Sequence, residues 1–346
     1  MTTDPGGPER RPLTVAVTGP TGDIGRSLLR ALDRDDRVAR IAAMARRPFD
    51  PAAEGLGKVE YRRADVLDAD AVREVIAGAD VVVHLAFMIM GGTQETTEIN
   101  LTGSRNVFRA AIDAGVARLV YASSVAAYGF GPDNPPVLTE DLEPRGTARH
   151  YYSAQKAELE QALRELLDGS GVAAYVFRPC IVAGPDALTL VQSIPYVRLS
   201  DRMPGAVRHA LELLPVLKPV IPDPGVPFQL VHHDDVAAAF QAAVVGEGDP
   251  GVYNLAGGGT LTLADLADAL GWYSIPVPDL AIGAAAELVA HLPFMPGEAQ
   301  WIESLRRPVI MDTTRARTLL GWEPRHDARE TLEAMVHTAR AERVIR

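Results

Sequence analysis

The pattern of apolar and polar positions predicts repeated strand–helix units over the first half of the chain. Short apolar runs typical of strands cover 13–18, 38–44, 59–63, 81–85, 118–122 and 172–177. Between them, apolar residues recur at helical spacing over 24–32, 69–77, 97–114 and 152–167. The run at 80–85 is apolar with little alternation, as in a strand that is buried on both faces. The pattern therefore predicts an α/β fold with a doubly wound parallel sheet covered by helices on both sides.

The regular alternation of predicted strands and helices is interrupted after residue 178. Nine prolines lie between 179 and 227 and exclude one long helix there. Strand–helix pairs return at 228–231 with 235–245, and at 251–255 with 262–270. We therefore expect a large domain over 12–185 with returning elements at about 228–270, a smaller substrate-binding lobe from 186–227 and 271–346, and a flexible tail at 1–11.

Composition narrows the class of protein. The 346 residues include 34 Lys+Arg and 45 Asp+Glu, a net charge of −11, which argues against a nucleic-acid partner. The single cysteine, Cys180, cannot form an internal disulfide, as is typical of a reducing compartment. Neither a secretion signal nor an apolar run long enough to span a bilayer is visible. We expect a cytoplasmic globular protein without a membrane partner.

A glycine-rich turn follows the first expected strand. Residues 18–25 read Thr-Gly-Pro-Thr-Gly-Asp-Ile-Gly, and a helix is expected directly afterwards. Glycines permit a tight turn, a close approach of the backbone to a pyrophosphate, and close packing of helix on sheet. The helix N-terminus offers unpaired N–H groups and a positive dipole end to the phosphates. This context predicts a dinucleotide site around Gly19, Gly22 and Gly25.

The end of the second expected strand indicates which dinucleotide binds. An acidic residue at that place would hydrogen-bond the ribose 2′-OH of NAD. This chain has Ala45-Arg46-Arg47 instead, and a guanidinium can hold a 2′-phosphate. The sequence favours NADP, with Arg46 as the residue that would bind its 2′-phosphate. NAD is the alternative, because two exposed arginines are also common in a solvated loop.

Candidate catalytic residues lie further along the chain. Tyr152 and Lys156 are four residues apart, which puts them on one helix face. An ammonium near a phenol is expected to lower the pKa of the phenol, and Tyr152 could then exchange a proton with a carbonyl or alcohol oxygen. Ser124, after the fifth expected strand, could donate a second hydrogen bond to that oxygen.

Further segments complete a resemblance that runs from about residue 13 to 325. They are Ala64-Asp65-Val66, His84-Leu85-Ala86, Asn100 with Gly103 and Asn106-Val107, the segment 121–129, Arg178-Pro179, 182–185, 231–236 and Tyr253-Asn254-Leu255. Together with the glycine turn and the Tyr152–Lys156 pair, they resemble the extended short-chain dehydrogenases/reductases, the NAD-dependent epimerase/dehydratase family. The resemblance implies a Rossmann fold, hydride transfer at nicotinamide, and homodimers that pair helices 97–114 and 152–167.

The resemblance and the motifs together give the expected site residues. The expected catalytic set is Ser124, Tyr152, Lys156 and Asn100, of which Lys156 would also hydrogen-bond the nicotinamide ribose. The expected cofactor site comprises Gly19, Gly22, Asp23, Ile24, Gly25, Arg46, Asp65, Val66, Leu85, Ala86, Ala122, Tyr152, Lys156, Pro179 and Val182.

Departures from the family pattern bear on the reaction. Val125-Ala126 occupy the place of the acidic pair of sugar-nucleotide dehydratases, which argues against elimination. The arginine with which epimerases grip a pyrophosphate is replaced by the segment 225–229, although Arg306 or Arg307 could play a related part. Apolar stretches at 211–220, 280–289 and 292–295 favour a small, partly apolar carbonyl or alcohol substrate. The alternatives are a nucleotide-sugar epimerase with tightly bound NAD and a cofactor-binding regulatory protein.

The run His232-His233-Asp234-Asp235 suggests a metal site at first sight. Consecutive strand residues point to opposite faces, so these neighbours should not converge on one ion. Asp234 is expected to cap the following helix instead. No metal site is predicted.

Overall fold

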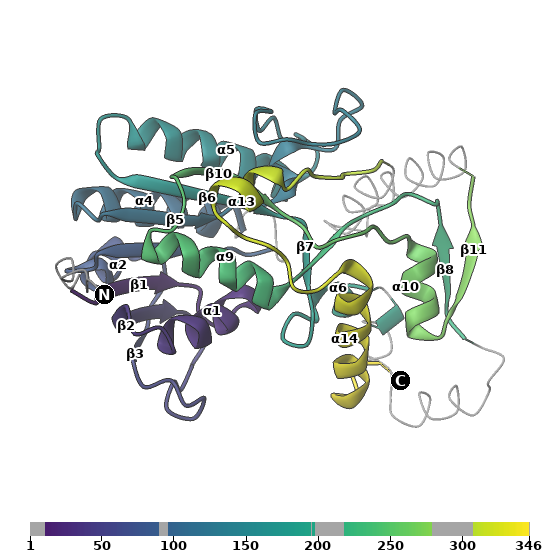
Figure 1. Ribbon diagram of the computed structural model, residues 1–346, viewed down its shortest axis with the longest axis horizontal. Coiled ribbons are helices and arrows are strands. Elements are labelled where there is room, and N and C mark those ends of the chain that lie inside the picture. The colour runs from purple at the N-terminus through teal and green to yellow at the C-terminus, as the bar shows by residue number, and fades with distance from the viewer. Residues whose placement is uncertain (1–10, 90–95, 195, 198–217, 279–306, 346) are drawn as a thin grey trace, which may run out of the picture.

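A parallel seven-stranded sheet forms the centre of the larger body of the molecule (Figure 1). The computed structural model describes residues 11–89, 96–194, 196–197, 218–278 and 307–345. The strand order is β10-β6-β5-β4-β1-β2-β3, and every neighbouring pair is parallel. The strands are β1 (Leu13–Thr18), β2 (Val38–Ala45), β3 (Val59–Arg63), β4 (Val81–His84), β5 (Arg118–Ala122), β6 (Ala173–Pro179) and β10 (Gly251–Leu255). The predicted doubly wound fold is confirmed, and β1, β3 and β5 have the predicted bounds.

Helices cover both faces of this sheet because its strands are apolar on both sides. On one face lie α1 (Asp23–Asp33) and α9 (His233–Val245), and on the other lie α2 (Ala69–Ile76), α4 (Ser104–Asp113) and α5 (Tyr151–Leu167). Val15 and Val17 belong to the core that contains α1 and α9, whereas Ala16 between them belongs to the opposite core. Successive side chains of a strand point to opposite faces of the sheet, so neighbouring residues of β1 pack in opposite cores.

The strand order changes direction between β1 and β4. The chain runs outward from β1 to β2 and β3, and then returns to add β4 on the other side of β1. Such a switch point leaves a crevice at the carboxyl ends of the two strands, where parallel α/β folds bind their ligands. The glycine turn and the segment after β4 therefore meet at the edge where a site is expected.

The helix expected over 97–114 is divided in two. Residues Glu98–Gly103 form a π-helical turn, η1, which leads directly into α4. Gly103 lies against Val66, and a Cβ added at this glycine would come within 2.4 Å of the Val66 Cγ2 atom. Single π-helical turns within helices are rare and are frequently associated with functional sites.

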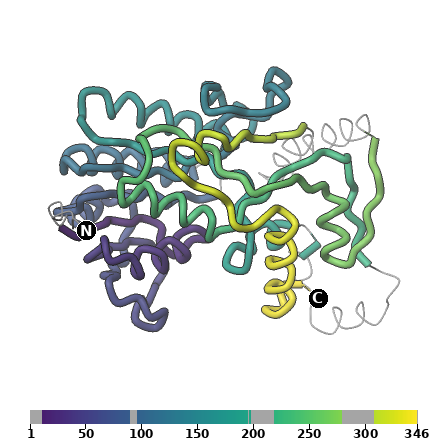
Figure 2. The backbone as a smooth tube through the Cα atoms, in the orientation of Figure 1, coloured from purple at the N-terminus to yellow at the C-terminus, as the bar shows by residue number. Residues whose placement is uncertain are grey.

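A smaller body lies beside the sheet (Figure 2). It contains α6 (Thr189–Gln192), α10 (Leu263–Leu270), α14 (Ala328–Ala341) and a parallel two-stranded sheet of β8 (Val220–Asp223) and β11 (Tyr273–Pro276). A further pair, β7 (Ile181–Ala183) and β9 (Leu230–His232), connects it to the larger body. Leu266, Leu332 and Met335 form part of its separate core.

The packing differs in three places from the division expected from the sequence. Helix α10, expected with the larger domain, packs in the core of the smaller body. Helix α13 (Thr314–Leu319), expected with the smaller lobe, packs against β10, and Trp322 after it lies in the core of the larger body. Strand β9 pairs with β7 outside the seven-stranded sheet. The chain therefore passes back and forth between the two bodies.

The part of the chain that the structure describes has no helix with the length and apolar character that a membrane crossing requires. The apolar stretches at 280–289 and 292–295, and most of 211–220, lie outside the described residues, as does Arg306.

Candidate active site

The glycine turn follows β1 and leads into α1. Gly19 has a positive φ of +75° and donates its backbone N–H to Met44 O at 3.0 Å. A Cβ at Gly19 would lie 2.6 Å from the backbone nitrogen of Ala86. Only glycine therefore allows the turn to approach the segment after β4 this closely.

The turn fits the phosphates of a dinucleotide. Helix α1 begins at Asp23, with Gly22 as an extended N-cap that provides no side-chain oxygen. The first N–H groups of a helix have no partner inside it, and they carry the positive end of the dipole. A Cβ at Gly25 would lie 2.5 Å from Gly19 O, so the turn is packed tightly on the helix. Asp23 accepts a hydrogen bond from Thr189 Oγ1 at 2.6 Å, and Ile24 packs on the adjoining core.

The carboxyl ends of neighbouring strands bring other expected cofactor residues to the same edge. Leu85 N donates to Thr18 O at 3.0 Å, which places Leu85 and Ala86 beside the turn. Asp65 lies after β3, where its Oδ1 accepts from Leu67 N at 3.0 Å, and Val66 is buried. Two more of the expected cofactor residues, Pro179 and Val182, lie at the end of β6 and in β7.

Three arginines gather beside the turn, at the ends of β2 and β3. Arg47 donates to Thr21 O at 2.8 Å, and the Nη2 atom of Arg46 lies 2.9 Å from Met88 Sδ. Arg63 donates from Nε to Arg46 O at 2.9 Å. Arg63 was not among the predicted residues, although the pairing of Ala45 with Arg63 in the β2–β3 ladder brings it there. This cluster of guanidinium groups suits an anionic group near the glycine turn.

The three expected reacting side chains meet at the same edge of the sheet. Tyr152 and Lys156 lie in the first turns of α5, and Ser124 follows β5 as the N-cap of the short 3-10 helix η2 (Val125–Tyr128). The Nζ atom of Lys156 donates to Ala122 O at 2.7 Å and lies 5.8 Å from the centre of the Tyr152 ring. The hydroxyl group of Tyr152 forms a hydrogen bond with the side chain of Ser124.

Burial controls the protonation of these groups. It raises the pKa of Tyr152 to about 12, against the smaller effect of Ser124. It also lowers the pKa of Lys156 to about 7, while the charge of Glu160 acts in the opposite direction. The expectation that the pKa of Tyr152 is lowered is wrong for this structure, because burial has the largest effect on this phenol and raises its pKa.

Aromatic side chains surround Tyr152 and Lys156. The Phe87 ring meets Tyr152 edge to face with centroids 5.4 Å apart, and the Lys156 Nζ lies 3.7 Å from the Phe87 ring centre. His150 lies 6.4 Å from Tyr152 and 5.0 Å from Phe130, centroid to centroid. Burial lowers the pKa of His150 to about 4, so it is neutral near pH 7. The surroundings of Tyr152 are thus largely uncharged.

Asn100 connects two segments that carry residues of the site. It is fully buried in η1 and bonds both backbone groups of Met88, at 2.8 Å and 2.9 Å. Its Nδ2 also donates to Gln155 Oε1 at 2.8 Å, and Gln155 lies on α5 beside Lys156. Asn100 therefore joins the segment after β4 to the helix that carries Tyr152.

The histidine cluster needs no metal ion to account for it. The ligand atoms of His232, His233 and Asp234 lie within 4.8 Å of one another, because the chain passes from β9 into α9 at His233. The reasoning that they cannot converge is therefore wrong. The His233 ring, however, bonds Ser27 Oγ at 2.7 Å and accepts from Asp186 N at 3.2 Å. His232, rather than Asp234, caps α9.

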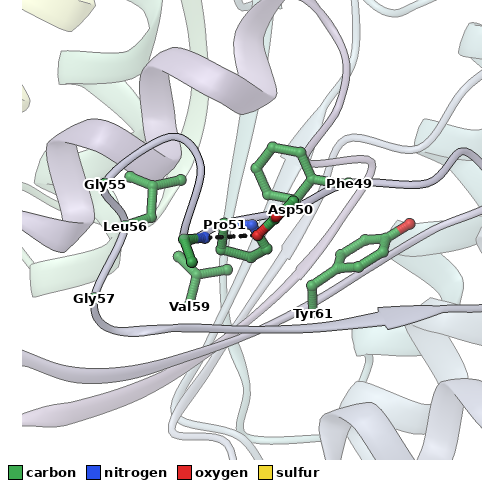
Figure 3. A pocket seen from close by; sticks show the side chains of 9 residues that line it. Phe49, Asp50, Pro51, Gly55, Leu56, Gly57, Val59 and Tyr61 are labelled. Carbon is green, nitrogen blue, oxygen red and sulfur yellow. Dashed lines mark hydrogen bonds between the residues drawn. The ribbon is translucent and has the colours of Figure 1, made fainter.

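Two other features lie outside the arrangement around Tyr152. Cys180 is buried, and burial raises the pKa of its thiol, so it is not a ready nucleophile. An open hollow of about 620 Å³ lies beside the loop between β2 and β3, where Phe49 and Tyr61 meet edge to face (Figure 3). None of the residues expected to form the active site lines it.

A glycine turn at the switch point, followed by a tyrosine and a lysine one turn apart on a later helix, defines the short-chain dehydrogenase/reductase class of enzymes. The profile of the NAD-dependent epimerase/dehydratase family matches residues 15–256, and the chain belongs to this family.

Curated relatives share modest identity with the chain. An uncharacterised protein of Mycobacterium bovis is 26% identical over 322 residues, which cover 91% of this chain and 81% of the relative. Cinnamoyl-CoA reductase 1 of Petunia hybrida is 31% identical over 192 residues, 52% of this chain and 57% of the reductase. The structure of DesIV, a dTDP-glucose 4,6-dehydratase from Streptomyces venezuelae with NAD bound, matches with a TM-score of 0.72 at 21% identity, over 96% of this chain and 98% of DesIV. At that identity the likeness shows a common fold.

Proposed function

We propose that this enzyme is an NADP-dependent oxidoreductase that interconverts a partly apolar carbonyl compound and its alcohol. The observation that carries the proposal is the meeting of Tyr152, Ser124 and Lys156 beside the glycine turn, in uncharged surroundings. The reductases among the partial relatives support a net redox reaction. Val125 and Ala126, which begin η2 directly after Ser124, place no acid there for an elimination.

The turn from Gly19 to Gly25 and the N-terminus of α1 would hold the pyrophosphate of the cofactor, and Arg46 would hold its 2′-phosphate. NAD-bound neighbours support a nicotinamide dinucleotide, and the arginine cluster supports the phosphorylated form. When bound, the dinucleotide supplies or accepts the hydride. The protein then has to orient the substrate oxygen and manage one proton.

The hydroxyl groups of Ser124 and Tyr152 would both bind the substrate oxygen. Tyr152 keeps its proton at neutral pH and so is ready to donate it as a carbonyl becomes an alcohol. Lys156 is held by its hydrogen bond to Ala122 O, and in its protonated form it would stabilise negative charge that develops on the tyrosine oxygen. The Phe87 ring covers Lys156 on another side and limits the access of water.

The fold neighbours also support a second candidate, a nucleotide-sugar epimerase. One of them, MoeE5, was solved with UDP-glucuronic acid and NAD. Of the two arginines considered for a substrate phosphate, the structure describes only Arg307, which is exposed. We favour net reduction because two rings that lie against Tyr152 carry no charge: Phe87 is apolar, and burial keeps His150 neutral.

Binding and turnover test the proposal together. We expect NADPH and NADP⁺ to bind more tightly than NADH and NAD⁺ in calorimetric titrations, and Arg46→Ala to remove the difference. With NADPH and a library of apolar ketones and aldehydes, we expect turnover that Tyr152→Phe lowers by about 100-fold or more. Tyr175→Phe is the matched control, because that hydroxyl bonds Gly248 O away from the site.

Other results would overturn the proposal. Full activity of Tyr152→Phe would contradict the role of the tyrosine. Tightly retained NAD, with conversion of UDP-sugars and no net oxidation, would establish the epimerase instead. Tight binding of dinucleotide without any turnover would favour a regulatory protein. We also propose a homodimer through the neighbouring helices α4 and α5, and a sedimentation mass of one chain would contradict it.

A further inference from the structure

A fully buried ion pair lies directly behind the reacting groups. Glu160 on α5 and Arg178 on β6 expose 3% and 1% of their side chains. The guanidinium donates from Nε at 2.9 Å and from Nη2 at 2.5 Å to the two carboxylate oxygens. It also lies 4.4 Å from the centre of the Tyr128 ring. Burying two charges is expensive unless their geometry is good, and this pair meets that condition.

Glu160 also holds the segment that carries Ser124. Its Oε1 accepts a hydrogen bond from Ser123 Oγ, next to Ser124 in the chain. One turn earlier on the same helix, Lys156 donates to Ala122 O at 2.7 Å. One further turn back, Ser153 Oγ donates to Ala126 O at 2.6 Å. Three side chains of α5 thus hold the segment on both sides of Ser124: two bond its backbone, and Glu160 bonds the Ser123 hydroxyl.

The same carboxylate is the counter-charge of Lys156. The other groups that face this lysine are the Phe87 ring, Tyr121 with its ring centre 5.1 Å from Nζ, Tyr152, and His84, which is buried. Burial and the charge of Lys156 lower the pKa of His84 to about 3, so this histidine is neutral. Both tyrosines keep their protons near neutral pH. Glu160 is therefore the anion among the described groups that act on Lys156.

We propose that Glu160 is a positioning residue of the active site: it holds Ser124 in place through Ser123, and its charge favours the ammonium form of Lys156. The two effects are separable, because Ser123 is neutral and the charge acts directly on the lysine. Arg178 pairs with Glu160 from the side of β6 and so offsets the cost of burying this side chain. The catalytic part of this inference rests on the proposed function, whereas the titration of Lys156 does not.

The charge effect can be measured without a substrate. The chain has three lysines, Lys58, Lys156 and Lys218, so lysine labelled with ¹³C at Cε gives a simple NMR spectrum. The signal that is lost in Lys156→Met identifies Lys156. We expect Glu160→Gln to move its titration midpoint to lower pH by about one unit or more. Glu160→Asp, which keeps the charge, should restore most of the midpoint.

Two controls make this measurement decisive. Glu158→Gln removes an exposed carboxylate that pairs with Arg105 on the same helix, and it should leave the midpoint unchanged. If Glu160→Gln does not fold because Arg178 is left unpaired, Glu160→Gln with Arg178→Met removes both charges and should still lower the midpoint. An unchanged midpoint in a folded Glu160 variant would overturn the charge effect.

The positional effect needs turnover and is tested with Ser123→Ala. We expect this variant to keep the Lys156 midpoint and NADPH binding but to lower kcat about tenfold or more, as loss of a supporting contact at a preorganised site does. Unchanged kcat would overturn the positional effect. If no carbonyl compound is turned over by the wild type, the proposed function fails, while the result of the lysine titration stands by itself.

Discussion

The close approach of Gly19 to the segment after β4 gives a quantitative prediction for Gly19→Ala. An alanine at a φ of +75° costs roughly 1 kcal/mol in backbone energy. Its Cβ would also lie 2.6 Å from Ala86 N and 2.8 Å from both Ala86 Cα and Leu85 C. These are backbone atoms of a packed edge and cannot rotate away, so overpacking adds about 1–3 kcal/mol. We expect a total loss of about 3 kcal/mol in the free energy of unfolding.

Gly115→Ala is the matched control. Gly115 follows α4 with a φ of +63°, and a Cβ there meets nothing within 4 Å. This variant therefore carries only the backbone penalty, roughly 1 kcal/mol. The difference between the two variants isolates the contact with Ala86.

Urea unfolding followed by circular dichroism measures both losses, and calorimetry with NADPH measures the site. We expect only Gly19→Ala to weaken NADPH binding, because the displaced turn carries the phosphate-binding groups. Equal losses of stability in the two variants would refute the packing argument. Unchanged NADPH binding in Gly19→Ala would refute the assignment of the turn to the cofactor.

Three further predictions concern buried polar groups. Hydrogen bonds from Arg37 lower the pKa of Asp35 to about 2, below its unfolded value of about 3.9. Asp35→Asn should therefore cost about 1–2 kcal/mol of unfolding free energy at pH 7, a difference that vanishes as the pH falls from about 4 to 2; a constant difference would contradict this. The thiol of Cys180 should react with Ellman's reagent only after denaturation, and fast native reaction would contradict its burial. Asn100→Ala should lower the unfolding free energy by about 2–4 kcal/mol, because Met88 and Gln155 lose their partners. A loss below about 1 kcal/mol would argue against that support.

Much of the fold was predictable because its strands are buried on both faces. A run such as Val81–His84 contains few residues that suit a surface, and the intervening helices have one apolar stripe each. The pairing of β9 with β7 was not predictable, because both strands have three residues and their partner is chosen by tertiary packing. The π-helical turn at Glu98–Gly103 was also missed; its last residue, Gly103, lies against Val66, which is distant in the chain.

The identities of the site residues were accessible from spacing, but their protonation was not. Tyr152 and Lys156 are visible as neighbours on one helix. Their pKa values follow from burial by Phe87 and other residues that are distant in the chain. Glu160 was not predicted, although its spacing indicates a place near the site: it follows Lys156 by one turn on the buried face of α5. Its partner Arg178 stands in an otherwise apolar strand, where a charged residue requires a counter-ion.

The repeated passage of the chain between the two bodies has a consequence for how the enzyme can be divided. After β6 the chain enters the smaller body at α6, returns with α9 and β10, leaves again with α10 and β11, and comes back at α13 before it ends in α14. No single cut yields two fragments that each contain one complete core. A nick in a connecting stretch should therefore leave both pieces associated, and the two bodies should unfold in one cooperative transition rather than one after the other.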